Sequence, residues 1–169
     1  MRYTRSRRKR SVILSALIIL ILIALVLFLT FVYLQFQIPI TTEGFILMQV
    51  DRLISVADTS IVQLKGECSE ISIYISPWQA SAISEGTSDV TPSRPSTHDI
   101  TVDILEGYDI MPIMVKITRL EENTYFAELI LQRWNHMLIL DIRPSDAIAT
   151  AVRTDTPIFI NESLVTKTC

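Results

Sequence analysis

Two short stretches of this sequence combine arginine, hydroxyl and acidic residues in the same order. Residues 94–100 read Arg-Pro-Ser-Thr-His-Asp-Ile, and residues 143–148 read Arg-Pro-Ser-Asp-Ala-Ile. Proline fits the first turn of a helix, and serine, threonine and aspartate suit the cap, where unpaired N–H groups meet the positive end of the helix dipole. Both stretches are therefore expected at the start of a helix.

The cations and acids in and after these stretches match the needs of phosphate-ester chemistry. Hydrolysis of a phosphodiester requires cations on the non-bridging oxygens, an activated water and a stabilised leaving group. Guanidinium groups make forked contacts with phosphate, carboxylates can hold a divalent cation such as Mg²⁺, and imidazole exchanges protons near neutral pH. The candidate phosphate ligands are Arg94, Arg143 and Arg153, and the candidate catalytic residues are His98, Asp99 and Asp146, of which the two aspartates are also the candidate metal ligands.

The same charged residues could instead be structural. Arg94 with Asp99, and Arg143 with Asp146, would then be ion pairs that hold the two helix starts. Aspartate at a helix start is stabilising without any function, and Asp146 fits a capping role better than a ligand role. Arg153, near the C-terminal end of its helix, would interact favourably with the dipole there.

The two histidines differ in the role that their positions favour. His98 lies beside an acid at an expected helix start, so a catalytic role and a structural role fit it equally well. His136 lies in an expected strand, which favours a structural role.

Longer pieces of the sequence resemble the bifunctional nuclease domain family. The resemblance extends from about Gly44 to Val165, and four pieces occur in the family's order. These pieces are Ile73–Ala80 (IYISPWQA), Arg94–Ile100 (RPSTHDI), Thr124–Ala127 (TYFA) and Asp141–Thr154 (DIRPSDAIATAVRT) with the following Pro157–Ile160 (PIFI).

The resemblance implies nuclease activity, with DNA or RNA as the substrate. The roles given above to single residues are inferred from their chemistry and not carried over from the family. The chain departs from the family pattern at Ser76, where the family usually has glycine, and at Gln79, where it usually has glutamate. The second departure removes a carboxylate and weakens the case for a functional role at that position.

Periodicity and turn signals predict an α+β fold with an antiparallel-rich sheet and about three short helices. Strand-forming residues with intervening turn signals, and clean alternation at 71–75, predict a meander of three strands between Gly44 and Ile75. Further strands are expected at 113–120, 124–133, 136–142 and 157–160, and helices at 77–85, at 96–106 and directly after Pro144.

The N-terminal segment joins a basic cluster to a long uncharged run. Residues 12–34 carry no charge and would span about 35 Å as a helix, enough to cross a bilayer. The sequence predicts a single transmembrane anchor at 11–36, a basic cytoplasmic tail at 1–10, a linker at 37–43 and an outward-facing domain at 44–169. An uncleaved anchor is favoured over a signal peptide, because the run is long and no small-residue cleavage site follows it.

The formal net charge of −3 conceals an uneven distribution. Residues 1–34 carry six basic residues and no acidic one, which leaves nine basic against eighteen acidic residues, a net charge of −9, on the remainder. This balance counts against broad, non-specific binding of a polyanion. It keeps open a second function, a non-catalytic oligomerising or ligand-binding module in which the arginine-proline stretches are structural or lie at subunit contacts.

The two cysteines, Cys68 and Cys169, match no metal-binding motif. In an outward-facing domain they could form a disulfide that closes a long loop, or they could both be free, and the sequence favours neither. The sequence also lacks a glycine-rich phosphate loop and a nucleophile elbow.

Overall fold

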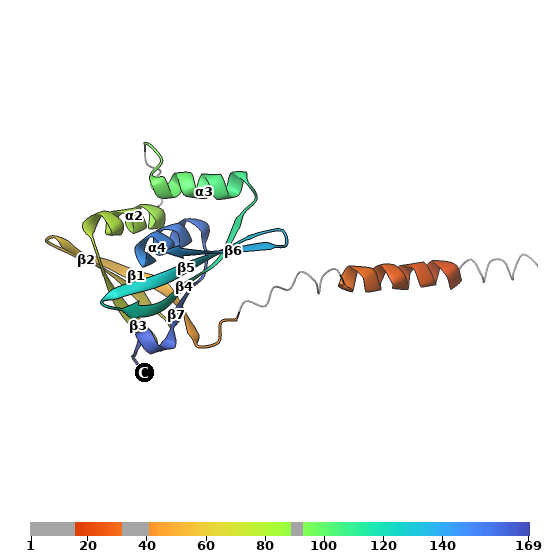
Figure 1. Cartoon of the computed structure of the whole chain (residues 1–169), viewed down its shortest axis with the longest axis horizontal. Helices are drawn as coiled ribbons and strands as arrows, with labels where there is room; N and C mark the ends of the chain where they lie inside the picture. Colours follow the sequence, from red (N-terminus) through yellow and green to blue (C-terminus); the bar gives the residue numbers. More distant parts are fainter. Residues whose placement is uncertain (1–15, 32–40, 89–92) are drawn as a thin grey trace, which may run out of the picture. The chain divides into compact units, whose positions relative to one another are not determined.

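The computed structural model describes residues 16–31, 41–88 and 93–169 (Figure 1). The chain from Thr42 to Cys169 forms a compact unit of its own. This unit holds the whole sheet, the hydrophobic core and both cysteines, so the packing described below involves no residue before Thr42.

The predicted membrane anchor falls only in part on described residues. A helix over residues 16–31 lies within the expected span of 11–36, while both ends of that span and the basic residues 1–10 lie outside the described part of the chain. No helix among the residues that the structure describes is both long enough and apolar enough to cross a membrane.

A single eight-stranded sheet is the framework of the unit from Thr42, with the strand order β6-β5-β4-β7-β1-β2-β3-β8. Its strands are β1 (Phe45–Val56), β2 (Thr59–Lys65), β3 (Ser69–Ile75), β4 (Met111–Glu121), β5 (Thr124–Arg133), β6 (His136–Ile142), β7 (Ile158–Asn161) and β8 (Thr166–Lys167). Neighbouring strands are antiparallel except for β4 and β7, which are parallel. The prediction of an α+β fold with an antiparallel-rich sheet is confirmed.

The short strand β7 joins the two halves of the sheet. It pairs in parallel with β4 on one side and antiparallel with β1 on the other. Its residues Ile158 and Ile160 are buried and belong to the hydrophobic core. The sequence predicted this strand but not its central place, because nothing local specifies which strands it pairs with.

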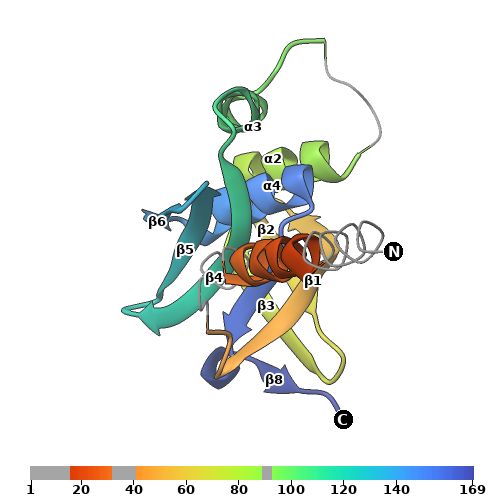
Figure 2. The same cartoon turned by 90° about the vertical axis from the view of Figure 1, so that its right-hand side faces the viewer.

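Three helices cover one face of the sheet, with α2 and α4 side by side and α3 outermost (Figures 1 and 2). They are α2 (Pro77–Thr87), α3 (Thr97–Gly107) and α4 (Pro144–Thr154), and a turn of 3-10 helix, Glu162–Leu164, precedes β8. Ser76 caps α2 through a capping box, in which the side-chain oxygen of Gln79 accepts a hydrogen bond from the Ser76 N–H at 2.8 Å. The amide of Gln79 thus performs the capping role that a glutamate would perform at this position.

Helix α4 is the centre of the packing. It contacts α2, α3, β4 and β5, and its small residues Ala147, Ala149 and Ala151 are almost completely buried. Pro144 occupies the first turn, and Asp155 ends the helix in the left-handed conformation at φ 51°. Alanine side chains allow close approach on every side, so this helix is enclosed and its charged residues project only from its two ends.

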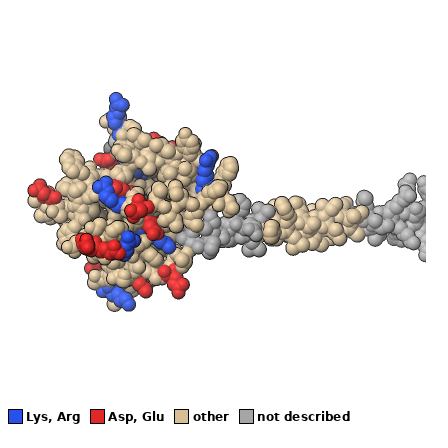
Figure 3. Space-filling view, in the orientation of Figure 1, with Lys and Arg blue, Asp and Glu red and all other residues tan. Residues whose placement is uncertain are grey.

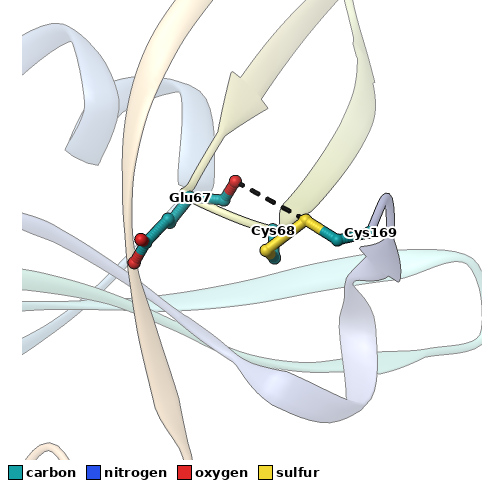
Figure 4. Close-up of a disulfide and its surroundings, with 3 residues drawn as sticks. All are labelled: Glu67, Cys68 and Cys169. Carbon is teal, nitrogen blue, oxygen red and sulfur yellow. Dashed lines mark hydrogen bonds between the residues drawn. A yellow bond between two sulfur atoms is a disulfide. The ribbon is translucent and has the colours of Figure 1, made fainter.

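Cys68 and Cys169 form a disulfide (Figure 4). Their Cα atoms lie 5.3 Å apart, and the bond joins the β2–β3 turn to the C-terminus across a sequence separation of 101 residues. Beside it, the N–H of Thr168 donates to the carbonyl oxygen of Cys68 at 3.1 Å, and β8 pairs with β3. The structure thus favours the paired alternative for the two cysteines, and the bond holds the C-terminal segment on the sheet.

Reduction of this disulfide should lower the free energy of unfolding of residues 41–169 by roughly 2–4 kcal/mol, because a bond across a long loop restricts the unfolded chain. Urea unfolding with and without dithiothreitol measures the change. The variant Cys68→Ser/Cys169→Ser is the control and should be insensitive to the reductant. An equal response of parent and variant would contradict the stabilising role of the bond.

Candidate active site

The two arginine-proline stretches, far apart in the sequence, meet in the fold. Nε2 of His98 lies 3.4 Å from Oδ1 of Asp146, and Nε of Arg153 donates to Oδ1 of Asp99 at 2.6 Å. Asp146 and Arg153 are two helical turns apart on one face of α4, whereas His98 and Asp99 are adjacent in α3. The first turn of α3 therefore contacts α4 at two points, one near the start of α4 and one near its end.

Asp99 has two structural tasks. Its Oδ2 accepts a hydrogen bond from the backbone N–H of Ser96 at 2.7 Å, and its own N–H donates to the Ser96 hydroxyl at 3.3 Å, which completes a capping box. Its other oxygen pairs with Arg153. The hydrogen bond from Arg153, followed by that from the Ser96 N–H, lowers the pKa of Asp99 from 3.8 to about 2.

Arg153 is buried, with only 7% of its side chain exposed. Its Nη1 donates to the carbonyl oxygens of Ala82 in α2 at 2.7 Å and of Ala149 in α4 at 2.8 Å. Its Nη2 is buried without a hydrogen-bond partner and lies 3.9 Å from Oε2 of Glu85. The guanidinium therefore joins α2, α3 and α4, and a phosphate could reach it only if these helices separated.

Gly86, near the end of α2, makes room for this guanidinium. A Cβ atom at this position would lie 2.6 Å from Nη1 of Arg153 and 2.7 Å from Cγ2 of Val152. The contribution of α2 was missed by the sequence analysis, which ended the helix at Glu85. A glycine inside a helix was the available signal, since it often marks a close approach of another group.

Asp146 and Arg143 form the exposed part of the arrangement. Nε of Arg143 donates to Oδ2 of Asp146 at 2.6 Å, and this hydrogen bond raises the pKa of Arg143. The Arg143 side chain is 71% exposed, while those of His98 and Asp146 are 21% and 23% exposed. These three residues, called here the His98–Asp146–Arg143 cluster, place a solvated cation and an imidazole on the two oxygens of one carboxylate.

Arg94 stands apart from the cluster. It is exposed and makes no hydrogen bond or ion pair within the described part of the chain. The ion pair weighed for it with Asp99 is replaced by the pair between Asp99 and Arg153, whereas the pair of Arg143 with Asp146 is present.

The predicted metal site at Asp99 and Asp146 does not fit the arrangement. Both oxygens of each carboxylate face a hydrogen-bond donor or a cationic partner, so a divalent cation would have to displace a guanidinium or the imidazole. No group of three or more histidine, cysteine, aspartate or glutamate side chains able to hold a metal ion occurs in residues 16–31, 41–88 and 93–169.

Comparison with known proteins supports the resemblance seen in the sequence. The sequence model of the bifunctional nuclease domain matches residues 61–169. An uncharacterized protein of Mycobacterium tuberculosis is 34% identical over 93 residues, which are 55% of this chain and 55% of that protein. Bifunctional nuclease 2 of Arabidopsis thaliana is 35% identical over 77 residues, 43% of this chain and 23% of that protein. The chain thus spans about half or less of the length of these relatives.

The ion pair between Asp99 and Arg153 predicts a pH-dependent contribution to stability. Asp99 stabilises the folded chain when ionised, because its pKa in the folded chain is about 2 and its ordinary value is 3.8. This contribution is complete above about pH 4 and is lost as the pH falls toward about 2. The melting temperature of Asp99→Asn should therefore lie below that of the parent at neutral pH and converge with it in acid.

The matched control is Asp103→Asn, on the exposed side of the same helix, whose difference from the parent should show no such convergence. If the melting temperatures of Asp99→Asn and the parent kept a constant difference down to about pH 2, the ion pair would not be the stabilising contact.

Proposed function

The chain belongs to the bifunctional nuclease domain family, and we propose on this premise that it is a nuclease that hydrolyses phosphodiester bonds in DNA or RNA. The proposal is carried by the His98–Asp146–Arg143 cluster, in which residues distant in sequence place a cation and a proton carrier together at the surface. Names of relatives such as Bifunctional nuclease 1 of Arabidopsis thaliana support the same reaction class.

Arg143 is the proposed phosphate ligand. Its Nε is held by Asp146, and its terminal nitrogens make no hydrogen bond within the described residues, so they are available to two oxygens of a phosphate group. A planar guanidinium binds phosphate in this forked manner. The hydrogen bond with Asp146 raises the pKa of Arg143 and thereby favours its cationic form.

His98 is the proposed proton carrier, and Asp146 positions it. The carboxylate of Asp146 lies beside Nε2 of His98, which leaves Nδ1 to accept a proton from the attacking water. The water oxygen then bonds to phosphorus while the bond from phosphorus to the leaving oxygen breaks. The leaving oxygen takes up a proton from solvent, and His98 afterwards returns the proton that it accepted to solvent. Asp146 holds both the base and the phosphate ligand, so this one side chain sets their separation.

Arg153 and Asp99 have no direct part in this proposal. Their contacts with each other and with α2 fix the first turn of α3 and hence the place of His98. Arg94 is exposed beside the start of α3 and would bind phosphate only as an outer contact. A divalent cation such as Mg²⁺ remains a proposal that would require a ligand arrangement different from the one described.

A second candidate function is a non-catalytic binding module. The net charge of −9 on the chain beyond residue 34 favours it, and on the face shown in Figure 3 basic side chains are scattered and do not gather into a patch. A nuclease with this surface would contact few phosphates, so its affinity for nucleic acid would depend only weakly on salt.

We also propose that residues 11–36 anchor the chain in a membrane, with the unit from Thr42 on the outer side. The uncharged run after a basic segment supports the anchor and its orientation. The disulfide supports the outer location, because such bonds persist in oxidising compartments.

The nuclease proposal predicts that His98→Ala and Arg143→Ala each lower the cleavage rate about 100-fold or more, because one removes the proton carrier and the other the phosphate ligand. The melting temperature of Arg143→Ala should change little, since Arg143 is mostly exposed, and circular dichroism checks that His98→Ala, whose side chain is 21% exposed, is folded. The assay uses the purified full chain in mild detergent with labelled single-stranded and duplex DNA and RNA, in Mg²⁺, Mn²⁺ or EDTA.

The matched control is His136→Ala, which removes the other histidine from an exposed position on β6 and should cleave like the parent. Equal cleavage by all four proteins would reject the assigned site. No cleavage of any substrate by the folded parent would favour the binding module.

The anchor proposal predicts that a compartment-sensitive reporter fused after Cys169 is active only in its extracytoplasmic form. A second fusion before Met1 should show the opposite pattern, because the basic residues are expected to stay in the cytoplasm. Activity of the cytoplasmic reporter at the C-terminus would contradict the proposed orientation.

A further inference from the structure

The edge strand β6 exposes an apolar surface that the proposed active site does not use. All of its residues from His136 to Asp141 are exposed, and four consecutive apolar residues, Met137–Leu140, are between 38% and 55% exposed. Leu138 and Leu140 pair with Leu131 and Leu129 on one face of the sheet, so Met137 and Ile139 point to the other face. The strand is therefore apolar on both faces.

One side of β6 also has unpaired backbone groups. The strand pairs with β5 alone, and within the described residues its backbone makes no hydrogen bond beyond that ladder. Edge strands usually carry lysine, proline or a bulge that discourages pairing with another chain, and β6 has none of these. A partner that covers this edge must supply apolar side chains together with a row of backbone donors and acceptors. Another β-strand supplies both.

The other edge of the sheet is different. Strand β8 has only two residues, Thr166 and Lys167, and the disulfide at Cys169 follows it. It is too short to pair with the seven residues of β6, so a head-to-tail chain of β6–β8 contacts is disfavoured. Pairing of β6 with β6 of a second copy is the arrangement that closes on itself by twofold symmetry.

We propose that β6 is the interface of a homodimer, in which it pairs antiparallel with β6 of a second copy across a twofold axis at Ile139. Ile139 is the middle residue of the strand, so this register uses all seven residues. It sets Ile139 opposite itself and Leu138 opposite Leu140 of the second copy. Every contact at the centre is then apolar.

Charge is compatible with this register. Asp141 is the only acidic residue of β6, and it would lie opposite Met137 of the second copy. The two Asp141 residues would be four residue spacings apart along the strands, about 14 Å, which is beyond the screening length in physiological salt. Registers centred closer to Asp141 would bring the two carboxylates together and are disfavoured.

The dimer does not depend on the nuclease proposal, but it would affect the candidate site. Arg143 directly follows Ile142, the last residue of β6, so each copy would place one His98–Asp146–Arg143 cluster just beyond an end of the paired strands. The two clusters would lie on opposite sides of the twofold axis.

Cysteine cross-linking of the full chain in membranes tests the register. Ile139→Cys should form a disulfide-linked dimer on mild oxidation, because the axis sets residue 139 beside its own copy. Leu138→Cys, equally exposed in the same strand, should not, and neither should Val56→Cys at the end of β1. Equal cross-linking of all three variants would reflect random collision and overturn the proposal, and cross-linking of Leu138→Cys alone would overturn the register.

Light scattering on residues 41–169 tests the dimer itself. The parent should have twice the mass of one copy and Ile139→Lys the mass of one copy, because a lysine at the axis repels its own copy. Val56→Lys, at a residue that is also well exposed, should remain dimeric. Since Ile139 is exposed in the single chain, both lysine variants should keep the parent's circular dichroism. A monomeric parent would overturn the proposal.

Discussion

Burial of the Arg153 guanidinium is the constraint on which the arrangement of the helices depends. A charge taken out of water costs several kcal/mol unless it is paired and hydrogen-bonded. Asp99 of α3 supplies the opposite charge, carbonyl oxygens of α2 and α4 accept hydrogen bonds from Nη1, and Gly86 leaves the space that the group needs. Any movement of one helix relative to the others would leave these groups unpaired, so the three helices are fixed as one layer.

The candidate site follows from this layer. Because Asp99 is held by Arg153 and by the capping box, the neighbouring residue His98 is brought beside Asp146. Asp146 in turn holds Arg143, whose side chain extends into solvent. Arg153 and Asp99, which have no direct part in the proposed chemistry, thus fix the positions of the cation and the imidazole. The two groups form a small local site on a unit whose net charge is negative.

The candidate site and the proposed interface are both placed by strand β6. Strand β6 is an edge strand because it pairs with β5 alone, and the helix layer leaves it exposed. The chain then turns at Arg143 directly into the buried helix α4. A surface suited to pairing and a surface suited to phosphate are consequently adjacent along the chain.

The sequence alone determined the features that depend on neighbouring residues. Strand-forming residues and turn signals predicted the strands of β1–β3 and of the β4–β5 hairpin. The proline and serine residues predicted the helix starts, and the motifs predicted the family. Only the tertiary structure decided that Arg153 is buried against Asp99, that Cys68 pairs with Cys169 and that β7 lies between β1 and β4. The physical reason is range: capping and periodicity act within a few residues, whereas these contacts join segments that are distant in the sequence and form only when the whole unit folds.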